Sequence, residues 1–193
     1  MYCERKATVR AGDFVTRDQD GNLYIEGYFA VFGGQYWLWD EAYETIDRGA
    51  FEGQTTQDVR ALVNHDSTLV LGRTIAGTLE LREDERGLWG SIKINQADQD
   101  AVNLYERVKR GDVSQCSFGF DILEQDMEYR EGEPTVWHIR KVKLYEVSVV
   151  TFPAYEDTAV EARKRELGNV RKNKKDSWRR KMHARLKGED YGA

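Results

Sequence analysis

The feature that most constrains the fold of this chain is a series of short apolar segments separated by turn residues. Four segments are rich in Val, Ile, Leu, Tyr and Trp: residues 24–32, 59–64, 74–82 and 87–94. Gly, Asp and Asn lie between several of them, at positions 20–22, 33–34 and 84–87. Short runs of this composition, bounded by turn residues, are typical of β-strands. We therefore expect a β-rich domain in which residues 74–94 form a hairpin.

The pattern changes to helical spacing over residues 97–110. Apolar side chains recur there three or four residues apart, and Gly111 follows as a stop signal: they are Ala101, Leu104, Tyr105 and Val108. Residues 113–122 and 135–152 return to strand character, and the chain after residue 155 is helical in pattern. Many strands with two helices predict an α+β fold, a mostly antiparallel β barrel or sandwich with helices packed around it.

Charge divides the chain into a body and a tail. Residues 161–193 contain twelve Lys or Arg and five Asp or Glu, whereas residues 1–160 contain 17 and 29, so the two parts carry about +7 and -12. We therefore expect one domain over residues 1–160 and a basic, helical C-terminal tail over residues 161–193.

Several classes of protein are disfavoured by the sequence. No stretch approaches the roughly 20 apolar residues that span a bilayer, and the N-terminus lacks an apolar signal core, so we expect a cytoplasmic protein. Cys3 and Cys116 are too few for a disulfide framework or a structural zinc site. The three histidines His65, His138 and His183 lack ligand spacing, so we expect no metal and no cofactor.

His65 is the first candidate for chemistry. It ends a strand-like run in which alternation places Ala61, Val63 and His65 on one face. Taken alone, it is better interpreted as a half-buried histidine at the rim of a sheet. It becomes a candidate base only in combination with other residues.

Ser117 is the candidate nucleophile. In an extended strand it faces away from the core side, to which we assign Cys116, Phe118, Phe120 and Ile122. Ser114 falls on the core side, so strand parity favours Ser117 as the accessible hydroxyl. Gly119 shares the face of Ser117 and leaves space for a substrate backbone.

Two alternatives to this assignment are an ordinary strand serine and a cysteine nucleophile. A thiolate is intrinsically the better nucleophile, which makes Cys116 a rival of Ser117. Burial among aromatic side chains would, however, raise the pKa of the Cys116 thiol. We therefore expect Cys116 to be a small core residue.

Glu146 is a carboxylate within the apolar run 144–150. Burying it without a partner is costly, so we expect it to reach solvent or a partner. A histidine is a suitable partner, because a carboxylate fixes the imidazole tautomer and stabilises the imidazolium that forms when a serine loses its proton. A salt bridge to Arg or Lys of a neighbouring strand is the structural alternative.

Five segments, in this order and spacing, resemble the prohead proteases (head-maturation proteases) of tailed phages, which are distant relatives in fold of the herpesvirus assemblins. The segments are residues 27–32, 44–51, 63–73 (through Val-Asn-His-Asp at 63–66 and Leu-Gly-Arg at 71–73), 109–120 and 144–154. The resemblance covers about residues 24–157. It implies a barrel of the herpesvirus-protease type and a serine endopeptidase.

The resemblance also implies roles for individual residues. His65 would be the base and Ser117 the nucleophile. Assemblins have a second histidine as third member, whereas the position that looks equivalent here is Glu146, so this chain would use a carboxylate. For the oxyanion hole the resemblance suggests the amide of Ala154, because Pro153 has no N–H.

The partners that the resemblance implies are the major capsid protein, through its scaffold-like segment, and the protease itself, through autocleavage. The place would be the immature capsid (prohead) in the host cytoplasm. The chain could also form a homo-oligomer, a question that the sequence leaves open, and no membrane partner is expected. The tail would be a packaging or self-cleaved segment, or an exposed amphipathic helix.

Two further hypotheses compete with a protease. The first is a catalytically inactive capsid-assembly or scaffold-binding module on the same fold. The second is a nucleic-acid arm in the tail, where basic residues 171–175 and 179–181 flank Trp178. The acidic body would not assist such binding, so we do not expect nucleic acid as a partner.

Overall fold

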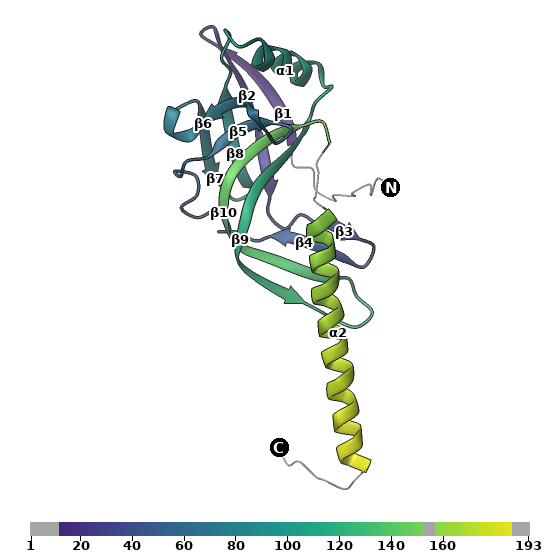
Figure 1. The fold of residues 1–193 in the computed structure, drawn as a ribbon. Helices are drawn as coiled ribbons and strands as arrows, with labels where there is room; N and C mark the ends of the chain where they lie inside the picture. The colour runs from purple at the N-terminus through teal and green to yellow at the C-terminus, as the bar shows by residue number, and fades with distance from the viewer. Residues whose placement is uncertain (1–11, 153–156, 187–193) are drawn as a thin grey trace. The chain divides into compact units, whose positions relative to one another are not determined.

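The computed structural model describes residues 12–152 and 157–186 of the chain (Figure 1). The chain divides into two compact units between residues 153 and 154. The strands β1 to β10 and the helix α1 belong to the first unit, and the helix α2 (Asp157–Leu186) belongs to the second. The structure is thus α+β, as the sequence predicts.

The first of two sheets is antiparallel, with the strand order β1-β2-β8-β7. Its strands are β1 (Gly12–Gln19), β2 (Asn22–Val31), β7 (Leu79–Glu83) and β8 (Gly87–Lys93). The predicted hairpin is confirmed for β7 and β8. Its first residues differ from the prediction, because Thr74–Ala76 form a 3-10 turn, η1, that ends at Gly77 with a φ of 67°.

The second sheet is built around one long strand. β10 (Thr135–Val150) pairs with β9 (Gln115–Glu128) along one edge, and Figure 1 shows these two strands side by side. Its other edge pairs in parallel first with β4 (Ala42–Ile46) and then with β5 (Arg60–Val63). The strands β3 (Tyr36–Trp39) and β6 (Asp66–Arg73) lie outside them and complete the order β3-β4-β10-β5-β6.

The predicted barrel is not found. The strand pairings are mostly antiparallel, as expected, but the strands of residues 12–152 form two sheets and no closed barrel. A sheet closes only when each edge strand finds a partner. The strands β1 and β7 are instead the ends of the first sheet, and β3, β6 and β9 are ends of the second. A barrel of the herpesvirus-protease type is therefore not confirmed.

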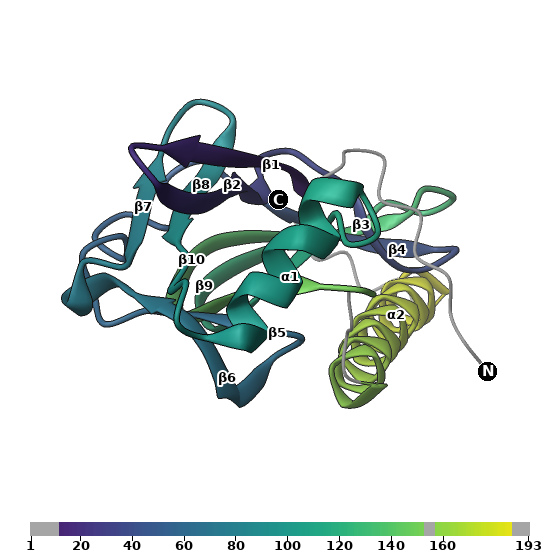
Figure 2. The same cartoon turned by 90° about the horizontal axis from the view of Figure 1, so that it is seen from above.

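The core of the first unit lies between the sheets and the helix α1 (Gln99–Arg110). Both sheets contribute fully buried side chains, among them Ile25, Phe29, Leu88, Ile139, Val147 and Val149. α1 buries the four apolar residues that its spacing predicts and contacts β1 and β2 (Figure 2). Asp98 caps its first turn, and Gly111 ends it with a φ of 87°.

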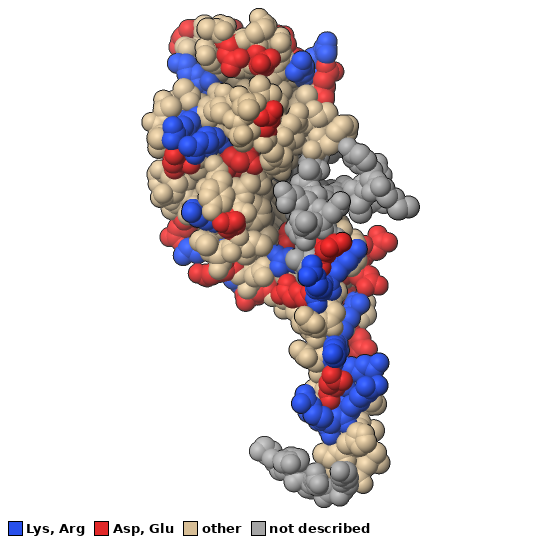
Figure 3. Space-filling model, in the orientation of Figure 1, with Lys and Arg blue, Asp and Glu red and all other residues tan. Residues whose placement is uncertain are grey.

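α2 confirms the helix predicted after residue 155. Lys and Arg side chains gather along it in Figure 3. Neither of the two described α-helices has the length and apolarity that crossing a membrane requires.

Candidate active site

Ser117 lies in β9, directly opposite Ser148 of β10. Residues opposite each other in an antiparallel pair share a sheet face, with Cβ atoms roughly 5 Å apart. The half-buried Ser117 therefore lies on the β10 face that carries Glu146 and Ser148. Strand register alone brings the candidate nucleophile next to the candidate acid.

The opposite face of β9 packs into the core, as predicted, over its first half. Cys116 is 7% exposed, and Phe118 packs edge-on against Phe51 with ring centroids 5.6 Å apart. The assignment of Ile122 to the core is wrong, because this side chain is 38% exposed. From residue 121 to 126 every β9 side chain is exposed, so strand parity no longer separates a core face there.

His65 does not lie in a strand. β5 ends at Val63, and Asn64 and His65 connect it to β6 with left-handed φ values of 50° and 62°. Positive φ at both central residues is typical of the tightest two-residue hairpin turns. The prediction that alternation aligns His65 with Ala61 and Val63 is thus wrong, because the turn sets the direction of the imidazole.

Three hydrogen bonds attach this turn to the end of β10. The Asn64 N–H donates to the Val149 carbonyl oxygen at 3.0 Å, and Asn64 Oδ1 accepts from the Thr151 N–H at 2.9 Å. The His65 N–H donates to Ser148 Oγ at 3.3 Å. A left-handed conformation in residues other than glycine costs energy, and these bonds offset that cost.

Glu146 pairs with His65. Its Oε1 lies 2.6 Å from His65 Nδ1, and its Oε2 accepts from Ser148 Oγ at 2.6 Å. The side chain of Glu146 is 14% exposed and that of His65 34% exposed. The carboxylate in the apolar run therefore has partners for both oxygens, as its burial requires.

This pairing has a chemical consequence for the imidazole. A carboxylate at Nδ1 favours the tautomer with the proton on Nδ1, which leaves Nε2 free to accept a proton. Among the described residues, Ser117 Oγ forms no hydrogen bond with His65. Such bonds are often long without substrate and tighten when it binds. The arrangement places a candidate base in contact with a carboxylate, and a candidate hydroxyl on the strand face that carries this carboxylate.

Gly119 lies opposite Glu146 in the ladder. A Cβ at this glycine would lie 2.6 Å from Glu146 Oε1 and 3.1 Å from its Cγ. The missing side chain therefore provides room for the carboxylate that contacts His65. Contact of Gly119 with a substrate stays a prediction.

The alternative nucleophiles lie in other surroundings. Cys116 Sγ lies 3.2 Å from the Phe29 carbonyl oxygen, and burial raises the pKa of its thiol to about 12. It is the core residue that the sequence predicts. Ser114 is exposed and precedes β9, so its predicted position on the core side is wrong because the strand begins one residue later.

The remaining predicted position is Ala154, which lies outside the described residues. Its proposed amide contribution stays a prediction. Within the described residues no group of His, Cys, Asp and Glu side chains is arranged to hold a metal ion.

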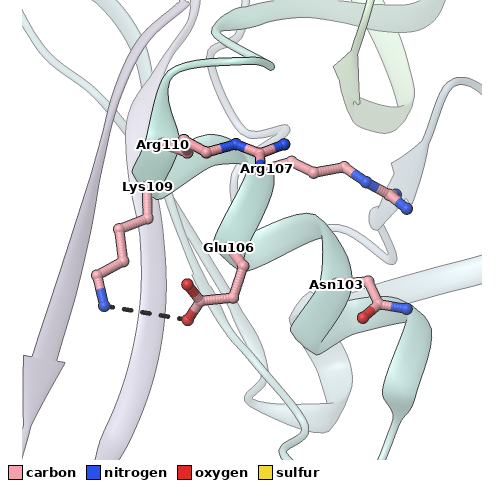
Figure 4. Close-up of a pocket in the computed structure, with 5 residues that line it drawn as sticks. All are labelled: Asn103, Glu106, Arg107, Lys109 and Arg110. Atoms are coloured by element: carbon pink, nitrogen blue, oxygen red, sulfur yellow. Dashed lines mark ion pairs between the residues drawn. The ribbon is translucent and has the colours of Figure 1, made fainter.

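A surface pocket lies elsewhere on the first unit. It has a volume of about 550 Å³ and is lined only by side chains of α1 (Figure 4): Asn103, Glu106, Arg107, Lys109 and Arg110. Glu106 and Lys109 approach to 4.0 Å across one helical turn. The pocket contains no candidate nucleophile, and the residues of the site do not line it.

Sequence reasoning missed two residues that organise the site, Asn64 and Ser148. The signal for Asn64 was present, because Asn is enriched at left-handed turn positions. Ser148 shares a strand face with Glu146 two residues away, which is a signal of proximity. The bond from the His65 backbone could not be predicted without the parallel pairing of β5 and β10.

Comparison with known proteins identifies the family of this chain. The profile of the family described as caudovirus prohead serine protease matches residues 9–173. The prohead protease of Enterobacteria phage HK97 is 30% identical over 151 residues, which are 75% of this chain and 62% of the relative. The prohead protease of Escherichia phage T5 is 32% identical over 97 residues, which are 50% of this chain and 42% of the relative.

The chain thus spans less than two thirds of the length of either curated relative. No solved structure matches it. The family profile nevertheless covers most of the chain, including the segments that carry His65, Ser117 and Glu146. This chain belongs to the caudovirus prohead serine protease family.

Proposed function

We propose that this protein is a serine endopeptidase of capsid maturation that acts through Ser117, His65 and Glu146. The observation that carries the proposal is the 2.6 Å contact between His65 Nδ1 and Glu146 Oε1. Ser117 lies on the same sheet face as Glu146, in the neighbouring strand. A histidine oriented by a carboxylate is the usual device for activating a serine hydroxyl. Family membership supports the same reading.

The reaction is acyl transfer in two steps. Ser117 Oγ attacks the peptide carbonyl carbon while His65 Nε2 accepts the hydroxyl proton, and the C–N bond breaks as that proton passes to the leaving amine. Water then attacks the ester carbonyl while His65 accepts its proton, and the ester bond breaks as His65 returns that proton to Ser117 Oγ and the acid product leaves. Glu146 stays ionised, orients the imidazole and stabilises its charged form.

The substrates in this proposal are the scaffold-like segment of the major capsid protein and the protease itself. The place of action is the prohead within the host cytoplasm. The names of the two relatives, both prohead proteases, support this assignment. The tail over residues 161–193 is the proposed packaging or self-cleaved segment, and its net basic charge distinguishes it from the acidic body.

The decisive experiment is co-production of the protein with the major capsid protein, followed by mass spectrometry of both chains. The wild type should cleave the capsid protein near its scaffold segment, and Ser117→Ala and His65→Ala should abolish cleavage. Ser114→Ala is the matched control, because this serine is exposed and lies outside the strand. Unchanged products with Ser117→Ala would overturn the proposal.

A further inference from the structure

Ser148 is a fully buried serine at the centre of the candidate site. Its hydroxyl accepts the His65 backbone N–H at 3.3 Å and donates to Glu146 Oε2 at 2.6 Å. One hydroxyl thus contacts both the backbone of the candidate base and the carboxylate that orients it. No other described residue is hydrogen-bonded to both His65 and Glu146.

We propose that Ser148 is a positioning residue that fixes the geometry of His65 and Glu146 for catalysis. This inference rests on the proposed function, because it assigns a role within the same site. Ser148 touches no reacting atom in the scheme, so it acts only through its two partners.

The hydrogen bonds form a closed ring. The His65 N–H donates to Ser148 Oγ, the Ser148 hydroxyl donates to Glu146 Oε2, and Glu146 Oε1 accepts from His65 Nδ1–H. A hydroxyl has one proton to donate. Ser148 donates this proton to Oε2, which holds that oxygen toward the serine and leaves Oε1 facing the imidazole. This cycle of hydrogen bonds therefore fixes both the rotation of the Glu146 carboxylate and the tautomer of the His65 imidazole.

Ser148 is not a second nucleophile. It lies opposite Ser117 in the ladder, but it is 0% exposed and its proton is donated to Glu146. Attack on a peptide carbonyl needs an accessible oxygen whose proton can pass to a base. Ser117 is the partly exposed member of the pair.

The test begins with Ser148→Ala, which removes the hydroxyl and keeps the backbone. Loss of a hydrogen bond to a charged group corresponds to a fall of about tenfold to a hundredfold in kcat. KM should change little, because Ser148 is buried away from the substrate. Ser148→Thr keeps the hydroxyl and should recover most of the rate.

Ser91→Ala is the matched control. Ser91 is also buried, at 6% exposure, and its Oγ donates to Glu26 Oε1 at 2.9 Å in the first sheet. The Ser91→Ala substitution removes the same kind of hydrogen bond, from a buried serine to a glutamate, in the other sheet. A fall in kcat equal to that of Ser148→Ala would show only a general effect of lost buried hydrogen bonds and would overturn the proposal.

A double-mutant cycle separates positioning from mere stability. Ser148→Ala should reduce kcat much less in a Glu146→Ala background than in the wild type, because one of the two bonds of Ser148 has already lost its acceptor there and only the bond from the His65 N–H remains. The proton NMR resonance of His65 Nδ1–H should be sharp in the wild type and broadened in Ser148→Ala. Additive rate losses, or an unchanged resonance, would overturn the positioning role.

Failure of this inference is distinguishable from failure of the proposed function. If Ser117→Ala is inactive and Ser148→Ala has the wild-type kcat, the protease assignment stands and the role of Ser148 falls. If Ser117→Ala keeps full cleavage, the assignment of the site falls, and the role of Ser148 falls with it.

Discussion

Two regions build the candidate site in different ways. The β9–β10 ladder carries Ser117 and Glu146 on one face of two long paired strands. The β5–β6 turn carries His65 in a two-residue connection with left-handed φ values. In the ladder, position follows from a regular register that many hydrogen bonds maintain. In the turn, position depends on a few specific bonds from Asn64 and Ser148.

The difference teaches where a substitution is expected to act. A strand residue is displaced mainly by steric conflict, because the ladder resists a shift of register. A turn residue is displaced when a local bond or a permitted φ is lost. Three substitutions test this contrast, beginning with the largest effect.

Gly119→Ala should have the largest effect on activity. Its Cβ would lie 2.6 Å from Glu146 Oε1, so the carboxylate must move away from His65. Displacement of a catalytic group by about 1 Å costs on the order of a hundredfold in rate. Steady-state cleavage of a capsid-derived peptide measures the loss. Gly168→Ala, where a Cβ meets nothing within 4 Å, should retain the wild-type rate.

Asn64→Ala should act on the turn and have an intermediate effect. The alanine loses the bond to the Thr151 N–H and must adopt a φ of 50°, which together cost about 2 kcal/mol. Asn64→Gly loses the same bond but tolerates this φ, so it should cost about 1 kcal/mol. Denaturant unfolding measures both. Equal losses for the two variants would show that backbone strain is unimportant in the turn.

Cys116→Ala should have the smallest effect, because this side chain lies on the core face of the ladder. Cleavage should persist at the wild-type rate, and a large loss would revive the thiol as nucleophile.

Burial raises the pKa of the Cys116 thiol from 9.0 to about 12. A raised thiol pKa stabilises the fold below pH 9 and loses that contribution as pH rises toward 12. Unfolding at pH 7 and pH 10 should therefore show a steeper loss in the wild type than in Cys116→Ala.

The contrast also explains which parts of the structure the sequence could predict. Apolar runs of strand character identified β2, β9 and β10, and period-two alternation placed Ser117 opposite the core side, because a strand has a fixed side-chain direction. Helical spacing and a glycine stop predicted α1 within two residues of its start. These features depend on neighbours in sequence.

The rest depends on contacts between distant segments. Alternation failed at His65 because the strand ended two residues earlier, and the left-handed pair Asn64–His65 has no periodic signature. The resemblance to a barrel fold predicted closure, whereas five of the described strands, β1, β7, β3, β6 and β9, have a partner on one edge only. Ser148 was overlooked because nothing in the sequence distinguishes it from an ordinary strand serine; only its hydrogen-bond partners do.

The parallel pairing of β5 with β10 has a consequence for folding. His65 and Glu146 are 81 residues apart in sequence, and they meet only when β5 lies along the last part of β10. Pairings of such long range form late and slowly, because the intervening loop must first be closed. The β9–β10 hairpin, in contrast, can form from adjacent segments and already places Ser117 beside Glu146. An incompletely folded chain would then hold the candidate nucleophile without its candidate base, so the proposed activity would be acquired only with the complete tertiary structure.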